Sequence, residues 1–387
     1  MTDEEYRSAA MDVVYLAACA VDGARPDPTR VARMDLKTLY QTAERHLLTG
    51  ITAMALESAG VRDEAFLQAK GKAVRKVAAF DLERAAVLAE LEKAGIWYMP
   101  LKGCILKDCY PKLGMRQMAD NDILCDPSRS GDIRRIMEDL GFTTVSYARE
   151  TQCHDEYEKP PVCCFEMHRS LFEAGVGDVI YRYYLKIRSK MLKDGDNGCG
   201  YHLSPEDFYV YITAHEYKHY SHRGTGLRSL LDIYVFLRSK GGTLDRTYIT
   251  KELDQLGLGE FEERNRGLAM HLFGGEKLSA EEEEMLDYIL SSGTYGTIGN
   301  QVSNSIRKKG DGLAGKLRYA LPRVFLPREL VRTVFPLFDR HPVLLPFLPA
   351  YRFVRGLKMG RGHRLRAELK ALAKHSPDRK QGKSFLL

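Results

Sequence analysis

Apolar residues recur at intervals of three and four positions through residues 1–94, as in the stretch MDLKTLYQTAERHLLTGITAMALES. This spacing places the apolar side chains on one face of an α-helix. A second stretch, DEAFLQAKGKAVRKVAAFDLERAAVLAELEKAG, continues the pattern and stops at Gly95, a residue type that commonly follows the end of a helix. The pattern therefore predicts a helical N-terminal domain over residues 1–94.

After Gly95 the pattern changes to short apolar segments that are typical of strands. IWYMP, residues 96–100, predicts a short buried strand, and residues 120–125 predict a second one after a helical turn. SGDIRRIMEDLGF predicts a helix, and TTVSY and VCCFEMH predict two further strands. Strands and helices in this order indicate a small α/β unit over residues 95–175. We therefore expect an α+β fold, in which a mostly helical chain surrounds a minimal α/β core with a short mixed sheet and flanking helices.

Helical spacing returns near Ser204, which is a suitable N-cap before a proline. PEDFYVYITAHEYKHYS and GLRSLLDIYVFLRS predict two helices, and two more lie between residues 247 and 273. The segment SAEEEEMLDYILSSG opens with Ser279 and an acidic first turn, which favours a helix N-terminus. These segments predict a helical C-terminal domain over 176–304, followed by a basic Pro- and Arg-rich extension over 305–387.

The chain has 387 residues, too many for one ordinary core, so its length favours two or three packed units. The apolar fraction of 44% and the charged fraction of 28% are those of globular proteins in water. No apolar run is long enough to cross a bilayer, and the acidic N-terminus differs from the basic start of a signal peptide. We therefore expect a cytoplasmic protein.

Eight cysteines are scattered along the chain without regular spacing, which favours free thiols in a cytosolic protein. The closest group with histidines is Cys153, His154, Cys163, Cys164 and His168. This group contains no Cys-x-x-Cys pair, the spacing that structural zinc sites usually show. A zinc site in this group is therefore an alternative that the spacing does not favour.

Charge is unevenly distributed along the chain. Residues 301–387 contain 20 Lys and Arg against 5 Asp and Glu, a formal charge of +15. Because the whole chain carries +6, residues 1–300 carry −9. An anionic partner for the basic tail 305–387 is one expectation: a membrane surface, or a nucleic acid on which aromatic residues of the tail would stack. The other interpretation is an extension that wraps the acidic part of the chain and neutralises it.

Two aspartates, Asp120 and Asp122, begin the predicted strand 120–125. Because side chains alternate between the faces of a strand, both carboxylates point the same way. Such a pair repels itself unless a cation lies between its members, and carboxylate oxygens are ligands of Mg²⁺. Glu166 and His168 share one face of a later strand, where a charged Glu among apolar neighbours requires a partner. Asp120, Asp122 and Glu166 are therefore the candidate metal ligands.

A candidate phosphate-binding turn precedes the aspartates. Lys102 and Gly103 follow a predicted strand and start a predicted helix, where backbone N–H groups and the helix dipole favour an anion. Lys102 adds a positive charge, and Arg116 is placed to bind another phosphate oxygen through its two-pronged guanidinium. The order of the elements carries more weight than any one motif: strand, Lys-Gly turn, helix, Arg, Asp-x-Asp strand and acid-bearing strand.

This order resembles the nucleotidyltransferase superfamily, whose members have a glycine-containing turn, an Asp-x-Asp strand and a third acid on a later strand. It is most similar to a family of poorly characterised bacterial nucleotidyltransferases. The residues that carry the resemblance are Leu101-Lys102-Gly103, Tyr110-Pro111, Arg116, Asp120, Asp122 and Glu166-Met167-His168. The resemblance is specific over residues 96–168 and extends loosely from the helical N-terminal region to GTYG at residues 293–296.

The resemblance implies transfer of a nucleoside monophosphate from an NTP to an unidentified hydroxyl acceptor, with release of pyrophosphate. It implies that Asp120 and Asp122 hold Mg²⁺ (or Mn²⁺), and that both share a second ion with Glu166. It also makes Glu166 a candidate base for the acceptor hydroxyl.

The turn departs from the superfamily pattern at one position. The superfamily usually has Gly-Ser, with the serine near the triphosphate, whereas this chain has Gly103-Cys104. The resemblance then implies nucleotide binding by Lys102, Gly103, Cys104 and Arg116, with phosphate contacts from the backbone and the two cationic side chains. A non-catalytic nucleotide-binding or scaffold protein of the same fold is the alternative that this departure favours, whereas the three retained acids favour an enzyme.

A competing motif is HEYKH, residues 215–219, which matches the His-Glu-x-x-His pattern of zinc metalloproteases. On a helix both histidines lie on one face, with the glutamate between them as the base. No metzincin extension follows, so a zinc metalloprotease is the less favoured alternative. His219, with His168, Arg228 and Asp232, is instead a candidate for the acceptor side of the nucleotidyltransferase site, and Asp232 also has the spacing to pair with Arg228.

Overall fold

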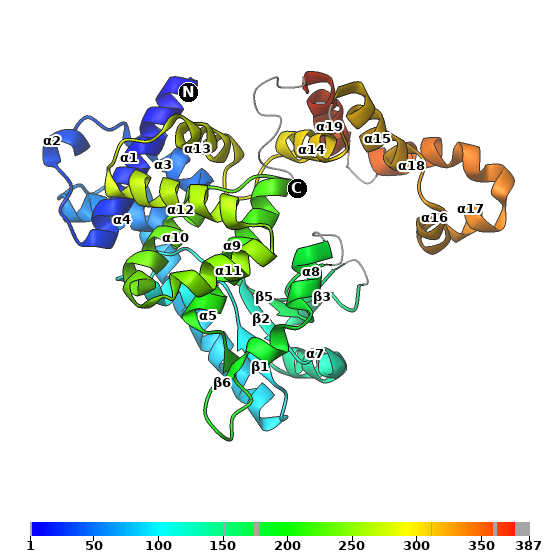
Figure 1. Ribbon diagram of the computed structural model, residues 1–387, viewed down its shortest axis with the longest axis horizontal. Coiled ribbons are helices and arrows are strands. Elements are labelled where there is room, and N and C mark those ends of the chain that lie inside the picture. Colours follow the sequence, from blue (N-terminus) through cyan, green and yellow to red (C-terminus); the bar gives the residue numbers. More distant parts are fainter. Residues whose placement is uncertain (1, 150–151, 174–177, 311, 359–361, 376–387) are drawn as a thin grey trace. The chain divides into compact units, whose positions relative to one another are not determined.

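The computed structural model of the chain is mostly helical, with one five-stranded mixed sheet (Figure 1). It divides into two compact units. The first consists of Met1–Lys218 and Gly226–Thr294, and the second of His219–Thr225 and Tyr295–Leu387. The residues that the structure describes are 2–149, 152–173, 178–310, 312–358 and 362–375. The finer division of residues 1–304 into three domains stays a prediction.

Helices precede the sheet, as the apolar spacing predicts: α1 Asp3–Asp22, α2 Pro28–Val31, α3 Leu36–Arg45, α4 Thr49–Ser58 and α5 Glu64–Lys93. Side chains cap several of their N-termini. Thr2 and Glu5 form a capping box at α1, and the Asp63 carboxylate accepts a hydrogen bond from the N–H of Phe66 at α5. These caps satisfy backbone donors that the first turn of a helix leaves free.

The sheet consists of β1 Tyr98–Pro100, β2 Asn121–Cys125, β3 Thr143–Ser146, β4 His154–Lys159 and β5 Cys163–His168. Their order in space is β1-β2-β5-β4-β3, with β2 and β5 parallel and the other neighbours antiparallel. The short helix α6 Gly103–Leu106 follows β1, and α7 Ser130–Asp139 follows β2. A small mixed sheet inside a mostly helical chain confirms the predicted α+β fold.

One face of the sheet is apolar and packs against α5 and α7. Phe165 and Met167 of β5 lie in one buried cluster with Phe80 of α5 and Ile133 of α7. Tyr157 of β4 belongs to the same cluster and is fully buried. Because side chains alternate along a strand, the residues between these positions point to the opposite face, which is polar.

The sequence pattern did not predict β4, because its residues HDEYEK are almost all charged. Asp155 and Tyr157 are buried, whereas His154 and Glu156 are half-buried on the polar face. Strands β3 and β5 flank β4 on both sides and satisfy its backbone groups. Pairing within the sheet therefore outweighs the poor strand propensity of these residues.

Helices also follow the sheet: α8 Asp178–Tyr184, α9 Pro205–His222, α10 Leu227–Lys240, α11 Arg246–Gln255, α12 Gly259–Gly274 and α13 Ala280–Ser292. A small hairpin, β6 Leu192–Lys193 and β7 Tyr201–His202, lies between α8 and α9 in sequence. Ser204 Oγ accepts a hydrogen bond from the N–H of Asp207, and Ser279 forms a capping box with Glu282. Both predicted helix starts are therefore confirmed.

The second unit contains α14 Ile298–Lys308, α15 Gly312–Val324, α16 Arg328–Val334, α17 Pro336–Arg340, α18 Leu348–Lys358 and α19 Gly362–Lys374. Two small apolar clusters hold these helices: Val302, Ile306 and Tyr319 in one, and Val331, Phe338 and Leu348 in the other. Among the residues that the structure describes, no helix is both long and apolar enough to cross a membrane.

Candidate active site

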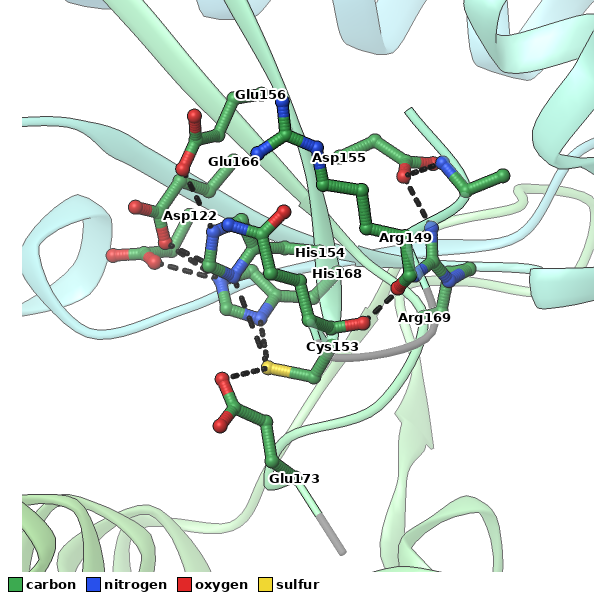
Figure 2. Close-up of polar contacts among 12 residues, drawn as sticks. Asp122, Arg149, Cys153, His154, Asp155, Glu156, Glu166, His168, Arg169 and Glu173 are labelled. Carbon is green, nitrogen blue, oxygen red and sulfur yellow. Dashed lines mark hydrogen bonds and ion pairs between the residues drawn. The ribbon is translucent and has the colours of Figure 1, made fainter. Parts of the chain in front are cut away.

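Asp122 and Glu166 lie opposite each other on the two parallel strands of the sheet. Asp122 of β2 pairs in register with Glu166 of β5, and Leu124 pairs with His168. The two carboxylates therefore share the polar face, with the histidine two residues further along β5 (Figure 2). One ligand atom from each of Asp122, Glu166 and His168 lies within 4.8 Å of the other two. We call Asp122 and Glu166 the carboxylate row.

His168 links the two acids of the row. Its Nε2 lies 2.8 Å from Asp122 Oδ1 and 3.3 Å from Glu166 Oε2. Burial by itself would lower the pKa of His168, but its hydrogen bonds to Asp122, Cys153 and Glu166 raise that pKa to about 10. The imidazole is therefore cationic at neutral pH and offsets part of the negative charge of the row.

Lys102 brings a second positive charge to Asp122 from the turn after β1. Its Nζ lies 2.7 Å from Asp122 Oδ1, and its backbone φ of 41° is in a region that residues other than glycine seldom adopt. Burial alone would raise the pKa of Asp122, but Lys102 and His168 hold it well below its usual range. Asp122 is therefore ionised, and the like charge of Glu166 is tolerated because two cationic side chains contact the row.

Asp120 precedes β2 by one residue and is half-buried. Burial and the neighbouring Asp122 carboxylate raise the pKa of Asp120 to about 6. Within the described residues, the groups of three that could hold a metal ion include Asp122, Glu166 and His168 but not Asp120. Joint metal binding by Asp120 and Asp122 therefore stays a prediction.

Strand β4 adds Glu156, which the sequence analysis did not single out, and His154, which it named only in the disfavoured zinc group. Glu156 pairs in register with Glu166, so Glu166 has carboxylate neighbours on both sides of β5. His154 Nδ1 lies 3.7 Å from Glu166 Oε2, and its Nε2 lies 3.3 Å from Glu156 Oε1. Because nearly every residue of HDEYEK is polar, no alternation in the sequence marked this face, and only the pairing with β5 places both side chains on it.

Cys153, just before β4, places its thiol against two imidazoles. Its Sγ lies 3.8 Å from His154 Nδ1, 4.0 Å from His168 Nδ1 and 4.0 Å from Glu173 Oε1 (Figure 2). Burial by itself would raise the pKa of this thiol, but the two imidazoles lower it to about 6. All eight cysteines are free, as their scattered spacing predicts.

Gly103 and Cys104 begin α6, a single helical turn. A Cβ atom on Gly103 would lie 2.6 Å from Arg116 Nη1 and 3.0 Å from Met118 Cε, so a larger residue would force these side chains to shift. The Cys104 thiol is buried and lies 3.4 Å from Asn121 Oδ1. Cys104 thus uses its side chain to pack the turn against β2, and nucleotide binding through its thiol stays a prediction without a contact to support it.

Arg116 is directed at Asp232 of α10. Its Nε and Nη2 donate to Asp232 Oδ1 and Oδ2 at 2.8 and 2.9 Å, and the Tyr110 hydroxyl donates to Oδ1 at 2.7 Å. Arg116 and Asp232 are both buried. The two-pronged guanidinium is therefore engaged within the protein, in contrast to the expected phosphate contact. Asp232 pairs with Arg116, where the sequence spacing suggested Arg228.

Two buried polar atoms, Arg228 Nε and Tyr211 OH, have no hydrogen-bond partner in the part of the chain that the structure describes. Arg228 Nη1 donates to the backbone oxygen of Gln117 at 3.0 Å. Tyr211, on α9, is fully buried, and burial is the main cause that raises its pKa. Of the nearby charged residues, Lys102 lowers this pKa and Asp122 raises it. Both atoms are therefore buried polar groups whose hydrogen-bonding capacity is unused among the described residues.

The HEYKH motif assembles no group of three potential metal ligands among the described residues, since none of those groups includes His215 or His219. Glu216 is buried, and its Oε2 accepts a hydrogen bond from Asn265 Nδ2 at 2.9 Å. Burial raises the pKa of Glu216 to about 8. His215 lies beside the Tyr211 ring, with 6.2 Å between centroids, whereas His219 is exposed. Helix packing therefore accounts for the motif, and the metalloprotease alternative gains no support.

A small mixed sheet with facing carboxylates beside a Lys-Gly turn is the arrangement of the nucleotidyltransferase class, as the motif order predicts. The model of a family described as uncharacterised nucleotidyltransferase matches residues 32–274, and the chain belongs to this family. The match includes residues 96–168 and confirms the resemblance, although it ends before GTYG at residues 293–296. No curated protein and no solved structure matched the chain.

Proposed function

We propose that the chain is a Mg²⁺-dependent nucleotidyltransferase that moves a nucleoside monophosphate from an NTP to a hydroxyl acceptor. In this reaction the acceptor oxygen bonds to the α-phosphorus, and the bond from that phosphorus to the pyrophosphate oxygen breaks. The proton of the acceptor passes to a base. The in-register pair of Asp122 and Glu166, with Lys102 beside it, is the observation that carries the proposal. Membership of the family supports the same class of reaction.

The donor atoms of the carboxylate row suit Mg²⁺ (or Mn²⁺). Nucleotide-dependent enzymes commonly bind Mg²⁺ through one or two carboxylates together with phosphate oxygens. Asp122 and Glu166 offer such oxygens within 4.8 Å of each other, and Asp120 is the proposed third ligand. When bound there, Mg²⁺ would neutralise phosphate charge and lower the pKa of an acceptor hydroxyl.

Other side chains would bind the nucleotide and move the proton. Lys102 supplies an ammonium group at the turn, and Arg228 Nε and Tyr211 OH are two of the buried polar atoms that have no partner among the described residues. Glu166 is the proposed base, because His168 lies 3.3 Å from its Oε2 and holds the carboxylate in place. Arg116 would act as a positioning residue through Asp232, and the acceptor-side role of His219 rests on its sequence position alone.

The first test measures thermal stability with ATP, CTP, GTP or UTP, with and without Mg²⁺. A ligand that binds only the folded state raises Tm by mass action. We expect one NTP to stabilise the wild type only with Mg²⁺, and Asp120→Asn/Asp122→Asn and Glu166→Gln to lose the response. Glu158→Gln, an exposed position on β4, is the control that should keep it.

Pyrophosphate release then separates an enzyme from a scaffold. The wild type with its NTP, Mg²⁺ and a panel of hydroxyl acceptors should release pyrophosphate, and Glu166→Gln should not. NTP binding without release from any acceptor would support the non-catalytic nucleotide-binding protein. Absence of any NTP response in the wild type would overturn the proposed function.

We further propose that the basic extension binds an anionic membrane surface. Three leucines recur at intervals of four residues along α15, and Phe325 continues the spacing just after the helix ends. Their side chains are exposed by 75, 52, 51 and 63%: Leu313, Leu317, Leu321 and Phe325. The extension that contains them carries +15 over residues 301–387. An apolar stripe within a basic segment favours the interface of a bilayer with anionic headgroups.

Vesicle sedimentation tests this surface. The full chain should bind vesicles of phosphatidylcholine with phosphatidylglycerol more tightly than phosphatidylcholine alone, and Leu317→Glu/Leu321→Glu should reduce binding at least tenfold. Leu82→Glu is the matched control, since Leu82 is an exposed leucine (72%) of the first unit. If vesicles are not bound while single-stranded RNA is, the stripe is not a membrane surface and the basic charge serves a nucleic acid.

A further inference from the structure

We propose that Cys153, His154 and His168 form a second metal site, which binds a thiophilic divalent cation such as Zn²⁺. One ligand atom from each of these residues lies within 4.8 Å of the other two. Sulfur and nitrogen donors favour Zn²⁺, whereas the oxygen donors of the neighbouring carboxylate row favour Mg²⁺. The two sites therefore select different ions, and the zinc site does not depend on the proposed transferase reaction.

The distances around Cys153 approach those between the ligands of a tetrahedral zinc ion. Its Sγ lies 3.8 Å from His154 Nδ1 and 4.0 Å from His168 Nδ1. Zn–S bonds of about 2.3 Å and Zn–N bonds of about 2.0 Å at tetrahedral angles separate sulfur from nitrogen by about 3.5 Å. The sulfur and nitrogen atoms therefore need to move by only a few tenths of an ångström to bind one ion, which is roughly the difference between the observed and the ideal distances.

Both imidazoles have Nδ1 within 4.0 Å of the thiol and Nε2 near a carboxylate, and His154 Nδ1 also lies 3.7 Å from Glu166 Oε2. His168 Nε2 lies 2.8 Å from Asp122 Oδ1, and His154 Nε2 lies 3.3 Å from Glu156 Oε1. A histidine bound to zinc usually donates its other N–H to a carboxylate, which fixes its tautomer and its orientation. The sheet already supplies both of these outer contacts.

Glu173 is the candidate for the fourth ligand. Its Oε1 lies 4.0 Å from Cys153 Sγ (Figure 2). It is not within the group of three close ligand atoms, so its side chain would have to move toward the imidazoles to complete the tetrahedron, and a water molecule would otherwise take this position. A set of one Cys, two His and one carboxylate has the nitrogen, sulfur and oxygen donors that zinc accepts.

The register of the β4–β5 hairpin builds this site, which explains why cysteine spacing did not favour it. His154 pairs with His168 at one end of the hairpin, and Lys159 pairs with Cys163 at the other. Cys163 and Cys164 therefore lie at the far end, away from the imidazoles, although they are close to His168 in sequence. No Cys-x-x-Cys pair is needed, because antiparallel pairing brings two distant histidines together.

His168 would couple the two metal sites. Its Nδ1 faces the thiol at 4.0 Å, and its Nε2 faces Asp122 at 2.8 Å. A cation on Nδ1 leaves the proton on Nε2, so the hydrogen bond to Asp122 is retained. Zinc would thereby fix the orientation of a proposed magnesium ligand, with His168 as the positioning residue.

The test titrates metal-free full-length protein with Zn²⁺ alone, and then with Co²⁺ as an optical substitute. We expect one ion per chain, a higher Tm with Zn²⁺, and a near-ultraviolet thiolate-to-Co²⁺ charge-transfer band. Cys153→Ser should lose the band and weaken Zn²⁺ binding at least about tenfold. Cys164→Ser is the matched control on β5 and should keep both properties.

A second variant, His154→Gln, should weaken Zn²⁺ binding while the thiol is still present, and circular dichroism in chelator establishes that each variant is folded. Absence of a thiolate band in the wild type, or its survival in Cys153→Ser, would overturn the zinc site. If Zn²⁺ binds without this band and Glu166→Gln abolishes binding, the ion occupies the carboxylate row. The zinc proposal then fails, whereas the nucleotidyltransferase proposal does not.

Discussion

Arg116 and Asp232 form a buried two-pronged ion pair across 116 residues of sequence, with N–O distances of 2.8 and 2.9 Å. Tyr110 adds a hydrogen bond of 2.7 Å to the same carboxylate. Helix α10 is thereby joined to the segment that leads from the Lys-Gly turn into β2. An arginine that the motif order suggested for phosphate binding thus positions the backbone that carries the carboxylates.

Asp232→Ala should lower the free energy of unfolding by about 3–5 kcal/mol, because it leaves the Arg116 guanidinium buried without its partner. Urea denaturation measures this loss. Glu138→Ala is the control: Glu138 pairs with Arg134 at the surface, with side chains 43 and 44% exposed, so solvent screening should make the loss of stability much smaller. Equal losses in both variants would contradict a special role for the buried pair.

Gly103→Ala should destabilise the protein by about 1–3 kcal/mol, because the added methyl overlaps Arg116 Nη1 at 2.6 Å. It should also weaken the Mg²⁺-dependent NTP response, since Lys102 is the adjacent residue. Gly131→Ala in α7 is the matched control, because its Cβ has no neighbour closer than 3.8 Å. That change should be neutral or stabilising by up to about 1 kcal/mol, and a similar loss from both would refute the steric explanation.

Glu216 should make the protein less stable as pH rises. Its pKa in the folded state is about 8, above the ordinary value of 4.5. Between these values the folded state retains a proton that the unfolded state has released, so the free energy of unfolding falls from about pH 4.5 to about pH 8. Near pH 4.5, Glu216→Gln should have the same free energy of unfolding as the wild type. Near pH 8, its free energy of unfolding should exceed that of the wild type by on the order of 3–5 kcal/mol.

Urea denaturation at several pH values measures this difference, with Glu158→Gln at an exposed position as the control. Glu216 Oε1 and Asn265 Oδ1 are both buried acceptors without a hydrogen-bond partner among the described residues. A proton on the Glu216 carboxyl supplies the donor that these two oxygens lack. A difference between Glu216→Gln and the wild type that does not change with pH would show that Glu216 titrates normally.

Lys102→Met should make the protein more dependent on Mg²⁺. The ammonium lies 2.7 Å from Asp122 Oδ1, where a metal ion would compete for the same oxygen. In the presence of a chelator we expect the free energy of unfolding to fall by about 1–3 kcal/mol, since a buried carboxylate loses a charged partner. Mg²⁺ should then raise Tm by more than in the wild type, whereas the added effect of NTP should fall.

Thermal melts across a Mg²⁺ titration check this result. Lys159→Met is the control, because Lys159 pairs with Glu83 at 2.8 Å near the far end of β4. It should leave the Mg²⁺ response unchanged. A Mg²⁺ response in Lys102→Met no larger than that of the wild type would show that the lysine and the ion do not share Asp122.

Periodicity along the chain was sufficient to predict the helices on either side of the sheet and most of the sheet, but not the helices α15 to α19 of the basic extension. The expected strands near residues 96–100 and 120–125 are present as β1 and β2, and VCCFEMH is present as β5. Strand β4 was missed because HDEYEK has neither apolar alternation nor strand propensity, and its stability comes from pairing on both edges. Local patterns do not contain that information.

The candidate site was predicted in part. Asp122, Glu166, His168 and Lys102 were predicted from motif order, and the structure brings them together. Arg116 was assigned to phosphate because its partner Asp232 lies 116 residues away, beyond any local pattern. Cys153, His154 and His168 were grouped from the sequence, but their spacing disfavoured a metal site, because antiparallel pairing of β4 with β5 is what brings the two imidazoles together.

The sequence by itself determined the helix and strand periods, the capping residues, the uneven charge and the motif order that led to the nucleotidyltransferase family. These properties depend on neighbours within a few positions, where backbone geometry follows directly from residue type. Only the tertiary structure decided which charges meet: Lys102 with Asp122, Arg116 with Asp232, and Cys153 with two imidazoles. The reason is that strand register and helix packing are set by burial over the whole unit, and a carboxylate takes the cation that this packing brings within reach.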